Sequence, residues 1–438
     1  MITTSIGKLF LKAYNEKYKK DCTAKEFFET EYFELFFNHP KYMQWVTNSP
    51  FVQMKSGQKP EKLSIYERLE KLNDLYLKVE SEVPDASFAI GYPASEQKEY
   101  ASTSGLVSDL SIDIEQEDVY YSWIGSGLGI GVSGGYNLLI NDAEIALKTF
   151  EGWKHYRKYL NDPALMKLRG NQINSWNGQW LTFRLGKRYI QDFNFSTLED
   201  EKVFSVQTSL AEINTVNWST LFFSLSNFYP ERILNAYIYS FGQTNKTIGF
   251  IPIYLKAGKT LKEVFRQMFH TDSPFNNKDF QSMFGMHIKR ACELGSIGLR
   301  ALRPANLKKY MEDSKSLSLK NEQDLLFYQS YKTWLIAMLS KNKEEITDYT
   351  YELAKLIIRY RNSAKGTKGK NLIEKDLFGA RSKRGFIDAL TEMLPDVKSP
   401  DLEALKKLKD EIHLMTNEEF GYFSTLLKFD YTFIEKQS

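Results

Sequence analysis

Six glycines fall within eleven positions of this chain, from Gly125 to Gly135, inside a stretch that is otherwise aromatic and β-prone. Glycine is favoured where the backbone takes a positive φ or where another group must approach the main chain closely. This density predicts either a glycine-rich hairpin with a bulge or a loop that lies against the backbone of a ligand. The residues around the glycines decide between classes of ligand.

Two phosphate-binding motifs fit the sequence poorly. Three glycines of the run have the spacing of a dinucleotide-binding fingerprint, but that fingerprint must open directly into a helix. Here residues 136–140 follow it and read as a strand, so a pyrophosphate would lack its helix N-terminus. A P-loop fails because Gly258-Lys259-Thr260 has Ile253 where the leading glycine belongs. The functional interpretation that remains is a loop against a nucleic-acid backbone.

Charge and composition limit the class of protein. The 438 residues carry a net charge of +3, so any nucleic-acid surface must be a local patch. Aromatic residues make up 14% of the chain, which favours stacking surfaces or large interfaces. Cys22 and Cys292 cannot form a four-thiolate zinc site or a disulfide framework, and we expect neither a metal nor a cofactor. Residues 1–19 predict an amphipathic helix rather than a secretion signal, and no run suits a membrane span, so a cytoplasmic protein is expected.

The pattern along the chain predicts an α+β protein. We expect a mixed α/β domain with antiparallel sheets at 1–315 and a helical bundle at 316–438. Helices are expected at 63–82, 142–160, 260–268, 324–339, 382–393 and 401–414, with a capping box at Thr23 and a last helix opened by Thr416. Strands are expected at 106–114, 119–140, 180–185, 204–211 and 221–225, and a hairpin at 238–251.

The expected bundle contains the clearest charge asymmetry of the chain. Residues 355–384 hold ten Lys or Arg residues against Glu374 and Asp376, a net charge of 10 − 2 = +8. Much of this segment, 361–370, is predicted to be an interhelical loop whose small residues let cations follow a phosphate backbone. The alternative is a solvated surface that acidic residues elsewhere balance. The ten cations are Lys355, Arg359, Arg361, Lys365, Lys368, Lys370, Lys375, Arg381, Lys383 and Arg384.

A second candidate segment, residues 170–180, concentrates side-chain amides around Trp176 and Trp180. Asn and Gln can read base edges by paired hydrogen bonds, and Trp can stack on a base. The alternative is a simple turn, because Asn177-Gly178 followed by a β-prone run is a strong hairpin signal. A hairpin could also present a reading loop, so the two interpretations remain open together.

Signatures of an enzyme are weak. The five histidines are scattered and no pair has the spacing of metal ligands. An acidic strand could hold magnesium, but its alternation with apolar residues more simply makes the carboxylates its solvent face. No serine sits in a nucleophile elbow. The acidic residues concerned are Asp109, Asp113, Glu115, Glu117 and Asp118.

The glycine-rich segment, the amide-and-tryptophan segment and the basic helical bundle occur in an order that resembles a known family. The chain is similar to the large subunits of type I CRISPR Cascade complexes, in particular those of type I-B. Comparable Gly-Leu-Gly-Ile-Gly-Val-Ser-Gly and Trp-Asn-Gly-Gln-Trp stretches, here at 127–134 and 176–180, carry the resemblance. Some relatives have paired Cys-x-x-Cys zinc motifs, and this chain departs from them.

The resemblance implies a non-enzymatic subunit of an RNA-guided complex that reads the motif flanking a DNA target, stabilises the R-loop and helps recruit a helicase-nuclease. Its partners would be the CRISPR guide RNA, double-stranded target DNA, the backbone and guide-5′-end subunits, and a small subunit. The flanking-motif readers would be Asn171, Gln172, Asn174, Asn177 and Gln179, with Gly127, Gly129, Gly131 and Ser133 of the glycine loop. The phosphate contacts would be Lys365, Lys368, Lys370, Arg381, Lys383 and Arg384.

Met311 adds a hypothesis about the small subunit. In type I-B systems this subunit can arise by internal initiation within the large-subunit gene, and residues 311–438 would form a self-contained bundle. Two other functions remain open. One is a metal-dependent nucleic-acid-processing enzyme that uses Asp109, Asp113 and Glu115, and the other is a purely structural assembly protein with an aromatic interface.

Overall fold

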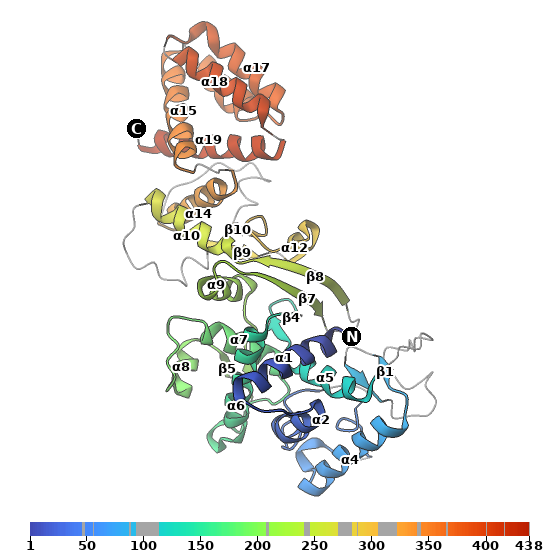
Figure 1. The fold of residues 1–438 in the computed structure, drawn as a ribbon. Coiled ribbons are helices and arrows are strands. Elements are labelled where there is room, and N and C mark those ends of the chain that lie inside the picture. Colours follow the sequence, from blue (N-terminus) through green and yellow to red (C-terminus); the bar gives the residue numbers. More distant parts are fainter. Residues whose placement is uncertain are drawn as a thin grey trace. The chain divides into compact units, whose positions relative to one another are not determined.

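The structure is a computed structural model, and the chain divides into two compact units, Met1–Leu255 and Lys256–Ser438, called here the N-terminal and C-terminal units (Figure 1). The protein is α+β and mostly helical, with small antiparallel sheets followed by a C-terminal helical region. The described residues are 1–45, 49–55, 57–86, 89–92, 114–206, 210–240, 246–269, 283–286, 288–304, 322–339, 343–364, 367–399, 401–415 and 417–437.

Helices make up most of the N-terminal unit. Its α-helices are α1 (Ile2–Tyr18), α2 (Ala24–Phe27), α3 (Glu34–Phe36), α4 (Ile65–Ser81), α5 (Gln116–Gly127), α6 (Ala143–Asn161), α7 (Ile173–Arg184), α8 (Phe195–Asp200) and α9 (Trp218–Phe228). Short π or 3₁₀ segments are η1 (Phe28–Phe33), η2 (Pro60–Lys62) and η4 (Pro163–Leu165). Capping boxes at Thr23 and Ser64 open α2 and α4, because each side chain accepts from the backbone N–H of a glutamate that returns the bond.

Strands of the N-terminal unit form one four-stranded sheet and two small ribbons. The sheet has the order β3-β4-β7-β8, and every pair in it is antiparallel. Its strands are β3 (Ile130–Val132), β4 (Tyr136–Ile140), β7 (Ile233–Ser240) and β8 (Lys246–Tyr254). The ribbons pair β1 (Asp85–Ala86) with β2 (Ile90–Gly91), and β5 (Phe204–Val206) with β6 (Ala211–Ile213).

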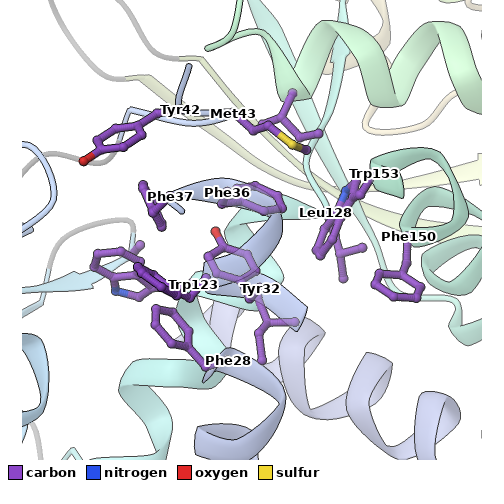
Figure 2. Packing of buried hydrophobic residues seen from close by; sticks show 14 of the residues in the cluster. Phe28, Tyr32, Phe36, Phe37, Tyr42, Met43, Trp123, Leu128, Phe150 and Trp153 are labelled. Atoms are coloured by element: carbon purple, nitrogen blue, oxygen red, sulfur yellow. The ribbon is translucent and has the colours of Figure 1, made fainter. Parts of the chain in front are cut away.

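The core of the N-terminal unit is aromatic, which accounts for much of the unusual composition (Figure 2). Tyr32 stacks on Phe36 with ring centroids 4.1 Å apart, and Phe37 stacks on Phe51 at 4.2 Å. Trp153 meets Phe36 edge-on at 4.8 Å. Such pairs add about 0.5–1.5 kcal/mol each beyond the area that they bury. Most of the aromatic excess therefore stabilises this core rather than forming a ligand surface.

Helices α1 and α5 cross at two glycines. A Cβ added to Gly125 would overlap the carbonyl oxygen of Thr3, and one added to Gly7 would overlap that of Tyr121. Real Cβ atoms essentially never come within 3.0 Å of such an atom. The first glycine of the dense run is therefore needed for helix packing, not for a ligand.

The C-terminal unit begins with a long amphipathic helix and ends in a helical bundle. Its elements are α10 (Lys256–Phe269), β9 (Phe284–Met286), α12 (Ile288–Leu294), β10 (Leu302–Pro304), α14 (Glu322–Leu339), α15 (Lys343–Ser363), α16 (Lys368–Asn371), η5 (Leu372–Leu377), α17 (Lys383–Met393), η6 (Leu394–Asp396), α18 (Asp401–Leu414) and α19 (Asn417–Gln437). Apolar side chains from α15 through α19 form one core, which includes the predicted face at Leu353, Leu356, Ile357 and Tyr360.

A buried ion pair ties α14 to the bundle. Lys332 Nζ lies 2.7 Å from Asp430 Oδ1, with the two side chains 8% and 0% exposed. Tyr328 donates to the same carboxylate at 3.1 Å, and Thr350 donates to its other oxygen at 2.7 Å. Because each carboxylate oxygen has a donor, the charge is paired and hydrogen-bonded inside the unit.

Several sequence predictions are confirmed and several are wrong. The predicted helices at 63–82, 142–160, 260–268, 324–339, 382–393 and 401–414 and the 238–251 hairpin are present. Three predicted strand segments are helices instead: 119–127 of the expected 119–140 strand lies in α5, 180–185 largely in α7, and 221–225 in α9. Each is a short apolar run that is buried on more than one side, and periodicity cannot separate such a strand from a buried helix. Most of 106–114 and the expected boundary near 315 lie outside the described residues.

None of the helices within the described residues is long and apolar enough to cross a membrane.

Candidate nucleic-acid interface

The amide segment and the glycine run lie against each other, but their polar groups face inward. Asn174, Asn177 and Gln179 belong to helix α7, so the predicted turn at Asn177-Gly178 is wrong. Asn177 is fully buried and donates to the carbonyl oxygens of Gly127 at 2.8 Å and Gly129 at 2.9 Å. Asn174 also donates to Gly129, at 2.9 Å. These bonds satisfy carbonyls at the C-terminal end of α5, where helical partners run out.

Two further amides of the segment bind the main chain of the same unit. Gln172 accepts from the backbone N–H of Ile213 at 3.0 Å, and Gln179 donates to the carbonyl oxygen of Asn214 at 2.7 Å. Asn171 is exposed, and its side-chain oxygen accepts from Arg169 at 3.1 Å. Of the five predicted base readers, Asn171 is therefore the one that solvent reaches most freely.

The second half of the glycine run forms the β3–β4 hairpin, as one of the two interpretations of the sequence predicted. Val132 pairs with Tyr136, which leaves a three-residue tip at 133–135. Gly134 and Gly135 take φ values of 93° and 76°, a region that glycine enters without steric cost. Ser133 donates to Val216 and Asn217 at 3.1 and 2.9 Å, and the tip is the only exposed part of the hairpin.

Gly129 and Gly131 are buried beneath α7. A Cβ on Gly129 would lie 2.5 Å from the Tyr239 hydroxyl and 2.6 Å from the Asn174 amide. A Cβ on Gly131 would lie 2.9 Å from the main chain of Asn174. The close approach that these glycines permit is thus to helix α7 and to Tyr239 of β7, all in the same unit.

The basic run of the sequence forms a helical hairpin, α16–η5–α17, called here the basic hairpin. Leu372, Ile373 and Leu377 point into the bundle core, which leaves the intervening lysines outside. Ser382 caps α17 by accepting from the backbone N–H of Gly385 at 3.1 Å. The predicted loop at 361–370 is mostly helical, since α15 continues to Ser363 and α16 begins at Lys368, while Lys365 lies outside the described residues.

The first cations of the run are held by close partners. Arg359 lies 2.7 Å from Asp401, Lys355 lies 2.7 Å from Glu352, and Arg361 pairs with Glu435. Lys383 donates to the carbonyl oxygens of Met415 at 2.8 Å and His413 at 3.4 Å, so it caps the end of α18. Lys383 therefore has a structural role that sequence reasoning did not anticipate.

The remaining cations have distant partners or none. Lys368, Lys370 and Arg384 lie 3.8–3.9 Å from single carboxylates, with side chains 69%, 54% and 92% exposed. The side chains of Arg381 and Lys375 are exposed and make no hydrogen bond or ion pair with any part of the chain that the structure describes. Exposed ion pairs of this kind contribute about 0–1 kcal/mol to the stability of the fold. A phosphate can therefore replace the carboxylate with little loss of stability. Lys375 was counted in the basic run but not among the expected phosphate contacts.

These cations are spread along the basic hairpin rather than gathered at a point. The pair between Lys368 and Asp396 brings the start of α16 beside the end of α17, whereas Arg381 and Arg384 stand at the start of α17. Eleven helical residues separate the two ends by about 16 Å. Such spacing suits several successive phosphates of a strand better than one isolated anion.

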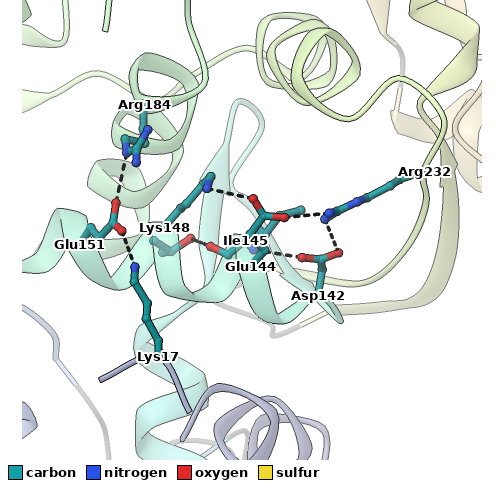
Figure 3. A network of polar contacts seen from close by, with 9 residues as sticks. Lys17, Asp142, Glu144, Ile145, Lys148, Glu151, Arg184 and Arg232 are labelled. Carbon is teal, nitrogen blue, oxygen red and sulfur yellow. Dashed lines mark hydrogen bonds and ion pairs between the residues drawn. The ribbon is translucent and has the colours of Figure 1, made fainter. Parts of the chain in front are cut away.

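Several cations of the N-terminal unit are neutralised by close carboxylates (Figure 3). Glu151 binds Lys17 at 2.9 Å and Arg184 at 3.1 Å. Glu144 binds Lys148 at 3.0 Å and Arg232 at 2.7 Å. Burial alone raises the pKa of Glu144, but hydrogen bonds from Lys148, Arg232 and Tyr229 lower it overall to about 2. These carboxylates stay ionised at neutral pH and keep their cations occupied.

Other cations of the N-terminal unit are buried against main-chain carbonyls. Arg157 donates to Leu35 and Lys41, and burial lowers its pKa to about 9. Arg68 donates to the carbonyl oxygen of Leu63 at 2.7 Å.

Burial, together with the Arg157 and Arg68 charges, lowers the pKa of His39 to about 4. The neutral form of His39 is therefore the form that the fold accepts.

The buried His39 predicts a loss of stability in acid. An unfolded histidine titrates near pH 6.5, so the folded state binds fewer protons than the unfolded state between about pH 6.5 and 4. The contribution of neutral His39 to the free energy of unfolding is fully present above about pH 6.5. It falls by about 1–2 kcal/mol as the pH drops towards 4, after allowing for the partial exposure of the side chain. Urea unfolding of the parent and of His39→Asn, at neutral pH and near pH 4.5, measures the difference. Identical pH dependence in the two proteins would refute the assignment.

The described residues contain no cluster of three or more His, Cys, Asp or Glu side chains that could hold a metal ion. Asp109 and Asp113 lie outside those residues, so the possible acidic metal site at 109–118 is described only in part. Glu115, Glu117 and Asp118 lie at the start of α5 rather than on a strand. Asp118 pairs with Lys8 at 2.7 Å, and Glu117 accepts from the backbone of Ala24 at 3.3 Å.

Comparison with known proteins finds no family model that matches the chain and no similar curated protein or solved structure.

Proposed function

We propose that this chain is the non-catalytic large subunit of a type I-B-like CRISPR RNA-guided surveillance complex, and that it holds nucleic acid through the basic hairpin. The observation that carries the proposal is a row of weakly paired cations along one helical hairpin. Lys375 and Arg381 lack counter-ions within the described chain, and three neighbouring cations have only distant ones. Several cations of the N-terminal unit, by comparison, have a carboxylate partner within 3.1 Å.

Under this proposal the chain acts in the cytoplasm with a guide RNA and double-stranded target DNA. The other partners are the backbone and guide-5′-end subunits, a small subunit that can start at Met311, and a separate helicase-nuclease. The basic hairpin holds the backbone of a displaced or paired strand. Reading of the flanking motif falls to groups that solvent reaches, namely Asn171 and the hairpin tip at 133–135. Asn174 and the buried Asn177 donate to the carbonyl oxygens of Gly129 and Gly127, just before the first strand of that hairpin.

A charge-removing variant of the basic hairpin tests the proposal. Replacing Lys368, Lys370, Arg381 and Arg384 with Gln is expected to weaken duplex binding about equally for all sequences, since phosphates carry no sequence information. The slope of log affinity against log salt should fall by about three to four, at roughly 0.9 per lost phosphate contact. Titration of the purified full chain with labelled duplex at several salt concentrations measures both quantities.

A matched control separates local contact from overall charge. Replacing the exposed Lys12, Lys59, Lys158 and Lys187 of the N-terminal unit with Gln removes the same formal charge. It should leave most of the affinity and the salt slope intact. If both quadruple variants lose the same affinity, or if the basic-hairpin variant binds like the parent, the proposed role of the hairpin is wrong and a purely structural function is favoured.

A further inference from the structure

The four-stranded sheet has one aromatic face that solvent reaches. Side chains that pair across β7 and β8 share a face, and Tyr237 lies opposite Phe250 while Ile233 lies opposite Tyr254. Phe250 is 69% exposed, Ile233 62% and Tyr254 43%. The opposite face of the same hairpin, with Ile251 and Ile253, is buried. Over β4 the same face carries Leu139, which pairs with Tyr237 and is buried, so only the β7–β8 part of this face is open to solvent.

The rings on this face are held by the sheet rather than by loops. Tyr237 and Phe250 have ring centroids 5.3 Å apart, and the Tyr237 hydroxyl lies 3.0 Å from the Thr247 hydroxyl. Aromatic side chains have only two rotatable dihedral angles. Those on paired strands therefore lose little conformational entropy when a ligand covers them. Tyr254 lies four residues from Phe250, about 13 Å further along the strand.

The two strands and their connection carry no acidic side chain that would repel a polyanion. Residues 233–254 contain Lys246 and no Asp or Glu. Proteins rarely expose adjacent large apolar side chains without a partner for them. Aromatic rings on a sheet surface that lacks carboxylates are the arrangement on which unpaired bases stack in single-strand-binding folds.

We propose that the exposed face of the β7–β8 hairpin, formed by Tyr237, Phe250 and Tyr254, is a stacking platform for unpaired bases of single-stranded nucleic acid. This inference rests on the proposed function, because it takes the ligand of the chain to be nucleic acid. It adds a second contact, in the N-terminal unit, that recognises bases through their faces. The basic hairpin, by contrast, recognises phosphates.

Substitutions at Phe250 distinguish ring stacking from simple apolar contact. Phe250→Ala and Phe250→Leu are both expected to weaken binding of a labelled single strand by about tenfold, since one base–aromatic stack contributes about 1–3 kcal/mol. Phe250→Trp should bind as tightly as the parent, because it keeps an aromatic face. Fluorescence anisotropy of the purified full chain with oligo(dT) and oligo(rU) measures the affinities, and circular dichroism checks that each variant folds.

Three controls complete the experiment. Binding of a DNA duplex should not change in any Phe250 variant, because its bases are already stacked. Tyr66→Ala removes an aromatic side chain that is 85% exposed on α4, beside Glu67 and Glu70, and should leave single-strand binding unchanged. The preference between oligo(dT) and oligo(rU) in the parent shows which polymer the platform takes.

The outcomes separate this inference from the proposed function. If Phe250→Leu binds like the parent, or if the parent binds neither oligonucleotide, the stacking platform is wrong. If Phe250→Ala loses single-strand binding while the basic-hairpin variant keeps the parent's salt slope, the platform stands and the role of the basic hairpin fails. The reverse result retains the basic hairpin and removes the platform.

Discussion

Gly125→Ala is expected to unfold the N-terminal unit or to destabilise it by at least about 3 kcal/mol. Helix propensity alone predicts that this substitution stabilises the protein, because alanine in a helix interior is favoured over glycine by up to about 1 kcal/mol. The new methyl group, however, would overlap the Thr3 carbonyl oxygen where α1 crosses α5. Two backbones would have to separate to admit it, and the helix pair between Gly7 and Gly125 would be lost.

Gly421→Ala provides the matched control for this effect. Gly421 also lies inside a helix, α19, but it is exposed and a Cβ there would meet nothing within 4 Å. It should stabilise the C-terminal unit by up to about 1 kcal/mol. Six of the seven tryptophans belong to the N-terminal unit, so urea unfolding followed by tryptophan fluorescence reports mainly on Gly125→Ala. An unchanged midpoint for that variant would contradict the close approach of α1 and α5.

Asp430→Asn is expected to destabilise the C-terminal unit by about 3–5 kcal/mol. The amide keeps only one of the two acceptor oxygens that Tyr328 and Thr350 use, and the ammonium group of Lys332 is left almost fully buried without a counter-charge. A buried charge without a partner is much more costly than a buried neutral pair.

The double variant Lys332→Met, Asp430→Asn isolates the charge. It should recover much of the loss, since a buried ion pair can be replaced by neutral groups of similar volume at little net cost. Thermal unfolding of both variants followed by circular dichroism gives the coupling between the two positions. Equal loss in the single and double variants would mean that hydrogen bonds, rather than the charge, explain the effect of Asp430→Asn.

Local signals of the sequence predicted the ends of helices well. Thr23, Asp142 and Ser382 cap helices through contacts that span only three residues, so neighbouring residues suffice to identify them. The alternation at 238–251 likewise predicted the β7–β8 hairpin. Both kinds of signal depend on groups that are close in the chain.

The amide segment shows where such reasoning failed. Asn177-Gly178 is a strong turn signal in isolation, yet Ile173, Trp176 and Trp180 repeat at helical spacing and are all buried. Trp176 and Trp180 donate to the carbonyl oxygens of Gly152 and Lys148, both on α6, at 2.7 Å. Contacts with α6 thus override the local preference for a turn, although the helical spacing of the apolar residues was present in the sequence.

The sequence by itself determined the class of fold, the caps of several helices and the position of the basic run. Only the tertiary structure decided which polar groups remain available to a ligand. Arg359 is occupied by Asp401, and Lys332 by Asp430, 98 residues away, whereas Arg381 keeps no partner within the described chain. The physical reason is that ion pairing and burial depend on distances through space between residues far apart in the sequence. For the same reason, the structure places Asn177 in the interior and Phe250 at the surface.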